Sequence, residues 1–186
     1  MEIRQKILDI GIGKGGLYAQ KAKNSVRFAL DYDPYHATLS QIEQNCGAMP
    51  IEGDGSCLRV PLPFKSSSFN KIDIIFPLDE LLYGLCYQNL IWEEFKRVLT
   101  NKGSFRIVTD SPWSGVQGVE VAGEPELIDN PQLHIESLAR SNGFDTKCKQ
   151  FSSQETEALG TEFSKMISSW QLEYPPTKVW EITGAK

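Results

Sequence analysis

The chain has 186 residues, of which 40% are hydrophobic and 23% are charged, and these proportions exclude wholesale disorder. Its length predicts a single domain spanning residues 1–186 that needs no disulfide or metal for stability. Nineteen basic and 24 acidic residues give a net charge of −5, which argues against a general polyanion binder and leaves room for a local basic face.

The sequence also indicates the cellular compartment and whether a metal is bound. No apolar run approaches the roughly 20 residues of a membrane span, and the polar opening of the chain predicts no signal peptide. The two histidines have no partner at a metal-ligand spacing, and no CxxC pair occurs among the four cysteines, Cys46, Cys57, Cys86 and Cys148. We therefore expect a cytoplasmic protein with reduced thiols and no metal site.

Predicted strands and helices alternate along the chain. Short apolar runs predict strands at residues 7–10, 26–30, 50–51, 72–76, 105–108, 144–151 and 178–183. Helical patterns occur at residues 17–23, 36–46, 81–99, 133–141 and 156–170. Residues 101–103 are typical of a helix C-cap, and residues 111–130 are predicted to form a long loop. This alternation predicts an α/β fold, a Rossmann-like doubly wound sheet with helices on both faces.

Ligands in such sheets bind at the carboxyl ends of the strands, so the residues after each strand are the candidates. The first strand ends in a glycine cluster with the spacing Gly11-x-Gly13-x-x-Gly16. Glycines at this place allow a tight turn and a close approach of the backbone to a ligand, and the next helix offers free N–H groups. A tight turn without a ligand explains the same glycines equally well.

Acidic residues follow the second and third strands. Asp31, about 20 residues after the glycines, has the spacing of a carboxylate that binds ribose hydroxyls. Asp33 precedes a proline and is typical of a helix N-cap. Asp54 lies between two glycines, where it either accepts a hydrogen bond from an adenine amino group or belongs to a solvated turn. Together with the glycine cluster, these residues predict a site for an adenosine-bearing cofactor.

Six segments, taken in order, resemble the class I S-adenosylmethionine-dependent methyltransferases: LDIGIGKGG, ALDYDP, GDG, SFNKIDIIFP, EFKRVLTNKGSFRIVTD and NGFD. The resemblance implies a seven-stranded sheet whose last strand is antiparallel, with S-adenosyl-L-methionine as cofactor. It implies that the methionine and ribose side is lined by Asp9, Gly11 and Gly13, that Asp31 binds the ribose and that Asp54 binds the adenine. It also assigns Ile75 and Ser168 to the cofactor.

A narrower resemblance lies in the second half of the chain. IDIIFPLDELLYGL, FRIVTDS, FSKMISSWQLEY and VWEITG are similar to the aminoglycoside-resistance 16S rRNA (adenine-N1)-methyltransferases. In that family two tryptophans clamp an adenine that is flipped out of the decoding site. The resemblance implies the 30S ribosomal subunit as partner and an acceptor site containing Phe76, Pro77 and Trp170. It also implies that the Phe76 carbonyl accepts from the adenine amino group.

Two departures from the narrower family bear on the acceptor. Leu78 stands where the family has its first clamp tryptophan, and Trp113 either supplies the missing face or packs within its loop. The basic cluster that follows the second tryptophan in the family is replaced by the acidic and apolar residues 171–176. Fewer basic residues mean fewer phosphate contacts on RNA. These departures concern the acceptor and leave the cofactor assignment unchanged.

Three functions therefore stay open. Methylation of a nucleobase nitrogen of RNA predicts a local positive patch, formed by Lys21, Lys23, Arg27, Lys147 and Lys149. Methylation of a small molecule, an amine or a natural product, predicts a closed pocket lidded by residues 111–130. The third is a catalytically silent cofactor-binding module that acts through a partner. Asp73, Trp92 and Trp180 are predicted to have structural roles.

Overall fold

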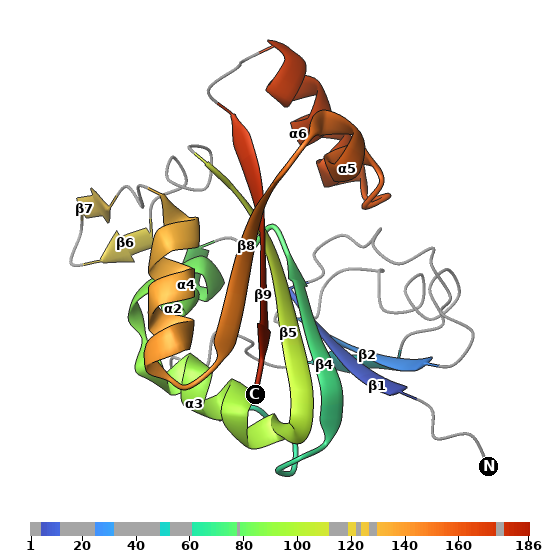
Figure 1. Ribbon diagram of the computed structural model, residues 1–186, viewed down its shortest axis with the longest axis vertical. Coiled ribbons are helices and arrows are strands. Elements are labelled where there is room, and N and C mark those ends of the chain that lie inside the picture. Colours follow the sequence, from blue (N-terminus) through green and yellow to red (C-terminus); the bar gives the residue numbers. More distant parts are fainter. Residues whose placement is uncertain are drawn as a thin grey trace.

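The computed structural model describes residues 5–11, 25–31, 49–52, 61–77, 79–111, 119–121, 124–126, 130–173 and 177–186. The large sheet consists of β1 (Gln5–Ile10), β2 (Ser25–Asp31), β3 (Met49–Glu52), β4 (Phe69–Ile75), β5 (Leu99–Ser111), β8 (Asp145–Phe151) and β9 (Lys178–Ala185). The described helices are α2 (Asp79–Tyr87), α3 (Asn89–Val98), α4 (Pro131–Ser141), α5 (Ser153–Glu157) and α6 (Glu162–Glu173). Figure 1 shows helices on both sides of this sheet.

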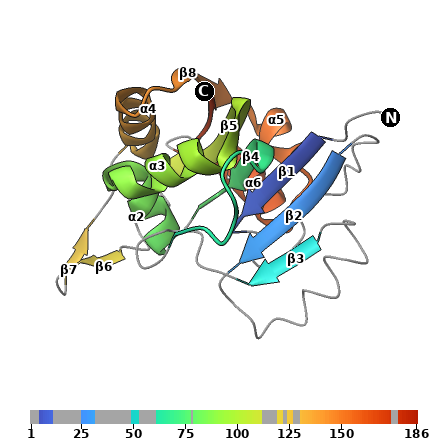
Figure 2. The ribbon, with the colours of Figure 1, turned by 90° about the horizontal axis from the view of Figure 1, so that it is seen from below.

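The sheet has seven strands in the order β3-β2-β1-β4-β5-β9-β8. Neighbouring strands from β3 to β5 pair in parallel, whereas β9 pairs antiparallel with both β5 and β8. The predicted Rossmann-like sheet, with seven strands and an antiparallel last strand, is confirmed. The strand order reverses between β1 and β4, and the carboxyl ends of these two strands are where such sheets bind ligands (Figure 2).

One face of the sheet packs against α2, α3 and α4 and forms the larger core. Leu8 and Ile10 of β1 point to this face and alternate with Ile7 and Asp9, which are buried on the other face, as the period of two along a strand requires. Trp92 of α3 is fully buried there, and its Nε1 donates to the Leu85 carbonyl over 3.0 Å. Trp180 is partly buried against the same core. Both tryptophans therefore have the structural roles predicted for them.

The opposite face holds a smaller apolar cluster beside α5 and α6. Its buried members are Ala29, Ile75, Phe76, Val108, Phe151, Ile167 and Val179, and Leu159 and Trp170 pack against them. The strand members stand near the carboxyl ends of β2, β4 and β5 and near the start of β9. We call this set the carboxyl-end cluster. It contains residues from all four segments that carry the narrower family resemblance.

The helix predicted over residues 81–99 is wrong in its extent, because the chain forms two helices. Gln88 has extended dihedral angles between α2 and α3, which lets each helix bury its own apolar residues. Helix α3 ends at Val98, and β5 begins at once and runs for 13 residues. Residues 101–103 therefore lie within a strand and do not form the predicted helix C-cap.

Two further predictions need correction. The helix predicted over residues 156–170 is also two helices, α5 and α6, separated around Gly160, whose φ of +78° favours glycine. The predicted loop over residues 111–130 contains β6 (Val119–Val121) and β7 (Glu124–Glu126), which pair antiparallel with each other. The β-branched valines of β6 favour extended backbone. The helices predicted at residues 17–23 and 36–46 lie outside the described residues.

None of the helices in the described ranges is long and apolar enough to cross a membrane.

Candidate active site

Gly11, the first residue after β1, has the backbone that the glycine pattern predicts for this position. Gly11 has a φ of +68°, and its N–H donates to the Leu30 carbonyl of β2 over 3.0 Å. A Cβ at this position would lie 2.8 Å from Leu81 Cδ2 of α2, so a larger residue would collide. The positive φ and the close approach of α2 both require glycine. Gly13, the second glycine assigned to the cofactor, lies outside the described residues.

Asp9 lies two residues before this turn and is completely buried. Its Oδ1 accepts from Arg27 Nη1 of β2 over 2.6 Å. Burial raises the pKa of Asp9 to about 7, although Arg27 opposes the shift. The other oxygen, Oδ2, is buried without a hydrogen-bond partner among the described residues. A buried acceptor atom of this kind, at the carboxyl end of β1, suits a ligand that brings a hydrogen-bond donor.

Asp73 of β4 lies in register with Asp9 and completes a buried charge cluster. One of its oxygens is 3.6 Å from Arg27 Nη1, and the other is 2.8 Å from Lys71 Nζ. Two carboxylates on adjacent strands thus share two cations, which explains how both remain buried. The structural role predicted for Asp73 is confirmed.

The chain after β4 has an unusual backbone at Phe76. This residue has a φ of +52°, which is strained for a bulky side chain, and only 6% of its surface is exposed. Its N–H donates to the Val108 carbonyl of β5 over 2.7 Å, a contact that holds the strained turn. Such strain costs about 1–3 kcal/mol and clusters at functional sites. Pro77 follows and is buried, and Leu78 lies outside the described residues.

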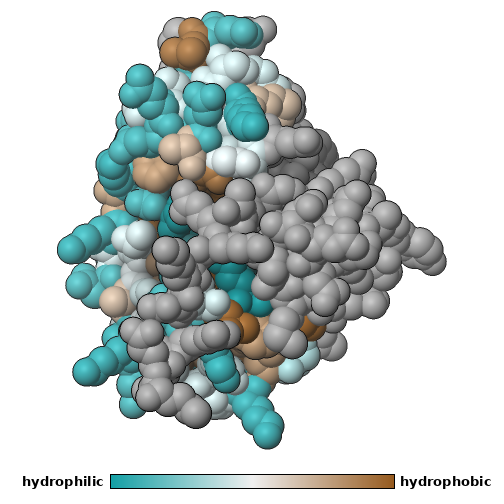
Figure 3. All heavy atoms as spheres, turned by 90° about the vertical axis from the view of Figure 1, so that its right-hand side faces the viewer, coloured by the Kyte–Doolittle hydropathy of each residue, from teal (hydrophilic) through white to brown (hydrophobic). Residues whose placement is uncertain are grey.

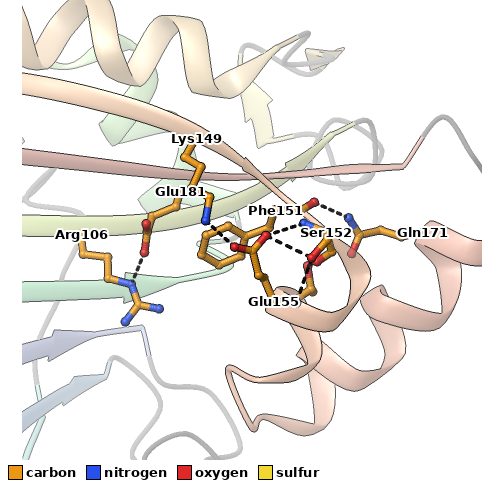
Figure 4. Close-up of polar contacts among 8 residues, drawn as sticks. Arg106, Lys149, Phe151, Ser152, Glu155, Gln171 and Glu181 are labelled. Carbon is orange, nitrogen blue, oxygen red and sulfur yellow. Dashed lines mark hydrogen bonds and ion pairs between the residues drawn. The ribbon is translucent and has the colours of Figure 1, made fainter.

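Trp170 reaches the same place from α6 and packs against the carboxyl-end cluster, which includes Ile75 and Phe76. Two hydrogen bonds flank it and tie α6 to the start of α5 and to the end of β8. Ser168 Oγ donates to the Ser153 carbonyl over 2.9 Å, and Gln171 Nε2 donates to the Phe151 carbonyl over 3.2 Å. Figure 4 shows the second of these contacts beside the start of α5. The structure therefore brings the assigned residues Ile75, Phe76 and Trp170 into one cluster.

Other assigned residues lie at the boundary of what the structure describes. Asp31 ends β2 in register with Glu52 of β3, as expected for a residue at a carboxyl end, but its side chain is outside the described set. Asp54 and Trp113 lie outside the described residues altogether. Their assigned roles stay predictions.

The predicted basic patch is not formed by those of its members that the structure describes. Arg27 is on β2, whereas Lys147 and Lys149 are on β8, and four strands of the sheet lie between them. Arg27 is held by Asp9, and Lys149 is paired with Glu155 of α5 (Figure 4). The hydrogen bond from Lys149 lowers the pKa of Glu155 to about 2. Lys21 and Lys23 lie outside the described residues.

The neighbouring charges of this face are also balanced. Arg106 of β5 forms an ion pair with Glu181 of β9 over 2.9 Å, beside the pair between Lys149 and Glu155 (Figure 4). On the side of the molecule drawn in Figure 3, hydrophobic residues occur in small separate areas between hydrophilic ones. Neither observation indicates a broad cationic or apolar docking face over the described surface shown there.

Asp110 is a candidate that the sequence analysis missed. It lies near the carboxyl end of β5 and is 2% exposed. Burial raises the pKa of Asp110 to about 6. The signal was in the sequence, because an aspartate follows the apolar run of β5 just as Asp31 follows that of β2. Among the described residues, no group of three histidine, cysteine, aspartate or glutamate side chains is arranged to hold a metal ion.

Comparison with known proteins supports the fold. No protein-family model matches the sequence, and no curated protein matches it significantly. Among solved structures, the 16S rRNA methyltransferase KamB superposes with a TM-score of 0.73 at 16% identity, over 99% of this chain and 88% of that chain. The [4+2]-cyclase SpnF superposes with a TM-score of 0.64 at 14% identity, over 100% and 76%.

A third structure is phosphoethanolamine N-methyltransferase 2 of Haemonchus contortus, in complex with phosphomonomethylethanolamine and S-adenosylhomocysteine. It superposes with a TM-score of 0.63 at 17% identity, over 100% of this chain and 49% of that chain. The superpositions show that the chain shares the class I methyltransferase fold, and at identities this low they show the fold alone. The three proteins differ in the reactions that their names describe, so the fold alone does not select a substrate.

Proposed function

We propose that the chain is an S-adenosyl-L-methionine-dependent methyltransferase that methylates a nucleobase nitrogen of RNA, N1 of an adenine in 16S rRNA. The observation that carries this proposal is the strained Phe76 at the end of β4, packed in one cluster with Trp170 of α6. The likeness to KamB adds support, because that protein is a 16S rRNA methyltransferase of the same fold. A ribosomal substrate implies that the protein works in the cytoplasm.

The residues at the end of β1 fit the proposed cofactor. The turn at Gly11 leaves no room for a Cβ, and Asp9 Oδ2 is a buried acceptor without a described partner. We assign Asp9, Gly11, Gly13, Asp31, Asp54, Ile75 and Ser168 to cofactor binding. Ser168 donates its own hydrogen to Ser153, so its oxygen remains an acceptor. When bound, S-adenosyl-L-methionine supplies a methyl group already activated on a sulfonium.

The acceptor side needs to position a base and stabilise a positive charge. Adenine N1 is neutral at pH 7 and carries a lone pair, so no general base is required. The indole of Trp170 offers a face for stacking, and the Phe76 carbonyl offers an acceptor for the amino group. Pro77 and Trp113 complete the residues that we assign to this side. Holding the base in line with the methyl group accounts for a large part of such a rate enhancement.

A small-molecule acceptor, an amine or a natural product, is the second candidate. The charge balance favours it, because Arg27 and Lys149 are held by carboxylates and do not form the basic patch that RNA binding predicts. The methyltransferase from Haemonchus contortus shows that the same fold serves small acceptors. A catalytically silent module that acts through a partner is the third reading, and methyl transfer to any acceptor would exclude it.

The experiment is transfer of labelled methyl from S-adenosyl-L-methionine to purified 30S subunits, read by primer extension. A strong new stop at one adenine is expected, because an N1-methyl group blocks the Watson–Crick edge. Trp170→Ala should remove the stop, whereas Leu172→Ala should retain it. Leu172 is the matched control, since it lies on the same helix with its side chain 73% exposed. Cofactor binding without any transfer to 30S would contradict the RNA proposal and favour a small acceptor.

A further inference from the structure

Arg27 of β2 reaches two carboxylates, one on β1 and one on β4. Its Nη1 is 2.6 Å from Asp9 Oδ1 and 3.6 Å from Asp73 Oδ2. The side chain of Arg27 is 13% exposed, and both aspartates are buried almost completely. An ion pair buried to this degree gains little net stability, because the cost of desolvating the charges offsets their attraction. Stability alone therefore does not account for Arg27.

The two carboxylates have different close cations. Lys71 Nζ lies 2.8 Å from Asp73 Oδ1 and belongs to the same strand, two residues earlier. Arg27 is nearer to Asp9 than to Asp73, so each aspartate has one close cation. Replacing Arg27 would leave Asp9 with only the more distant charge of Lys71.

The hydrogen bond from Arg27 also fixes how the carboxylate of Asp9 is turned. It uses Oδ1, while Oδ2 is buried with no hydrogen-bond partner among the described residues. Asp9 stands two residues before Gly11, at the carboxyl end of β1, where we assign the cofactor. S-adenosyl-L-methionine carries a sulfonium and an amino group that is protonated at neutral pH. An ionised carboxylate binds such a cationic donor better than a neutral carboxyl does.

The ionisation of Asp9 depends on the charged side chains that face it from the neighbouring strands. Burial raises the pKa of Asp9 to about 7, and Arg27 opposes this shift. Asp73 raises the pKa further, and Lys71 lowers it by the smallest amount. Farther along the sheet, Arg106 of β5 is in register with Asp73 and is held by its own ion pair to β9 (Figure 4). Arg27 is therefore the cation with the largest influence on Asp9.

We infer that Arg27 is a positioning residue of the cofactor site, which holds Asp9 by Oδ1 and favours its ionised form, so that Oδ2 accepts a hydrogen bond from the cationic cofactor. This inference rests on the proposed function and adds regulation of the same site. The affinity for S-adenosyl-L-methionine rises as Asp9 loses its proton, and Arg27 sets the pH at which this occurs. Arg27 acts through Asp9.

The test measures cofactor affinity by calorimetric titration at pH 6, 7 and 8 in wild type and Arg27→Met. Wild-type affinity should fall by about fivefold from pH 7 to pH 6, because the protonated form of Asp9 binds poorly. Loss of the adjacent cation raises the pKa of Asp9, so Arg27→Met should bind about tenfold or more weakly than wild type at pH 6. This ratio should become several-fold smaller at pH 8, where more of Asp9 is ionised in the variant.

The ratio to wild type removes the titration of the cofactor's own amino group, which affects every variant equally. Arg140→Met is the matched control, because Arg140 pairs with Glu136 on the surface of α4. It should bind the cofactor as wild type does at each pH. Arg27→Lys keeps a cation on β2 and should regain part of the affinity that Arg27→Met loses.

Asp73→Asn should move the pH profile in the opposite direction. It removes the like charge that raises the pKa of Asp9, and it leaves Arg27 to Asp9 alone. Affinity at pH 6 should therefore exceed that of wild type by about fivefold, and the two should agree at pH 8. A purely structural disturbance of the cluster would instead weaken binding in Asp73→Asn and in Arg27→Met at every pH.

Each other outcome is decisive. Wild-type binding that does not vary with pH, or a loss in Arg27→Met that is the same at pH 6 and pH 8, would overturn the inference and leave the proposed function intact. If circular dichroism shows that Arg27→Met does not fold, an unshifted profile in Asp73→Asn overturns the inference. The expected profiles without methyl transfer to 30S would support the inference and contradict the RNA acceptor. Wild type that binds no S-adenosyl-L-methionine would overturn both.

Discussion

The two faces of the large sheet differ in what their side chains contribute. The face under α2, α3 and α4 is a continuous apolar core, in which Trp92 makes edge contacts with Phe95, Phe105 and Phe144. Among the described residues, the opposite face carries buried and half-buried ion pairs together with the apolar carboxyl-end cluster. Burial of apolar area stabilises the first face, whereas charge balance limits the cost of burial on the second.

This difference indicates which face of the sheet carries residues that serve function and which carries residues that serve stability. Close-packed apolar residues tolerate few changes, because each substitution leaves a void or a clash. The second face keeps costly features near the proposed ligands: a strained Phe76, the buried Asp9 and the buried Asp110. Costly features that persist at one end of a sheet indicate that function, and not stability, accounts for them.

The largest expected loss of stability comes from a substitution in the apolar core under α2, α3 and α4. Trp92→Ala should lower the free energy of unfolding by about 3–5 kcal/mol, because it removes a fully buried ring that neighbouring side chains cannot replace. Urea denaturation measures the effect. Leu133→Ala on α4, where the side chain is 59% exposed, should change the stability by less than about 0.5 kcal/mol. Equal losses in the two variants would contradict the assignment of Trp92 to the core.

The next largest loss of stability comes from a substitution in the charge cluster of Asp9, Arg27 and Asp73 on the other face, and this loss depends on pH. Arg27→Met leaves Asp9 and Asp73 without the cation they share, which should cost about 3 kcal/mol at pH 8. The pKa of Asp9 is already raised to about 7, so the folded protein holds a proton between about pH 4 and pH 7 that the unfolded chain releases. That contribution to stability is lost as the pH rises through 7, and removing Arg27 raises the pKa of Asp9 further.

The loss in Arg27→Met should therefore be smaller at pH 5 than at pH 8, as measured by urea unfolding at both values. Arg140→Met provides the comparison. Its guanidinium pairs with Glu136 on the surface of α4, and its removal should have a small effect at either pH. A loss that is the same at pH 5 and pH 8 would argue against protonation of the buried carboxylates.

The smallest expected effect on stability comes from substituting glycines of positive φ. Of the two glycines compared, only Gly11 is expected to affect cofactor binding strongly. Gly11→Ala adds backbone strain and a collision with Leu81, and it should weaken S-adenosyl-L-methionine binding by tenfold or more. Gly160→Ala adds only backbone strain of about 1 kcal/mol, since nothing lies within 4 Å of its Cβ position. Calorimetric titration with the cofactor compares them. Unchanged affinity in Gly11→Ala would remove the turn after β1 from the proposed site.

The sheet could be predicted because most strands contain a short apolar run followed by a residue suited to a turn or a ligand, such as Gly11 after β1 and Asp31 at the end of β2. The helix boundaries could not, because the apolar repeat of residues 81–99 continues through Gln88 and hides the change of direction there. Gly160 was the signal for the second break. In a helical pattern an isolated glycine is tolerated often enough that its presence alone does not end a helix.

The site was predicted in part for similar reasons. Motif positions place Ile75, Phe76 and Trp170 together, and the structure packs them in one cluster. The prediction of the basic patch was wrong because the positions of lysines and arginines in the sequence do not show which strands become neighbours. Arg27 and Lys149 belong to strands near opposite edges of the sheet. The backbone strain at Phe76 was also beyond prediction, since the hydrogen bond that holds it comes from β5, which is distant in sequence.

The insertion of β9 between β5 and β8 has a consequence for how the molecule assembles. Among the described strands, β8 pairs only with β9, and β9 is made after β8, α5 and α6 during synthesis. The segment carrying Trp170 thus cannot dock fully until the last strand has emerged and threaded between its two neighbours. Such late, non-local pairing slows folding. We expect nascent chains to mature in two stages, with the β1–β4 half compact first and the half that carries Trp170 completed only afterwards.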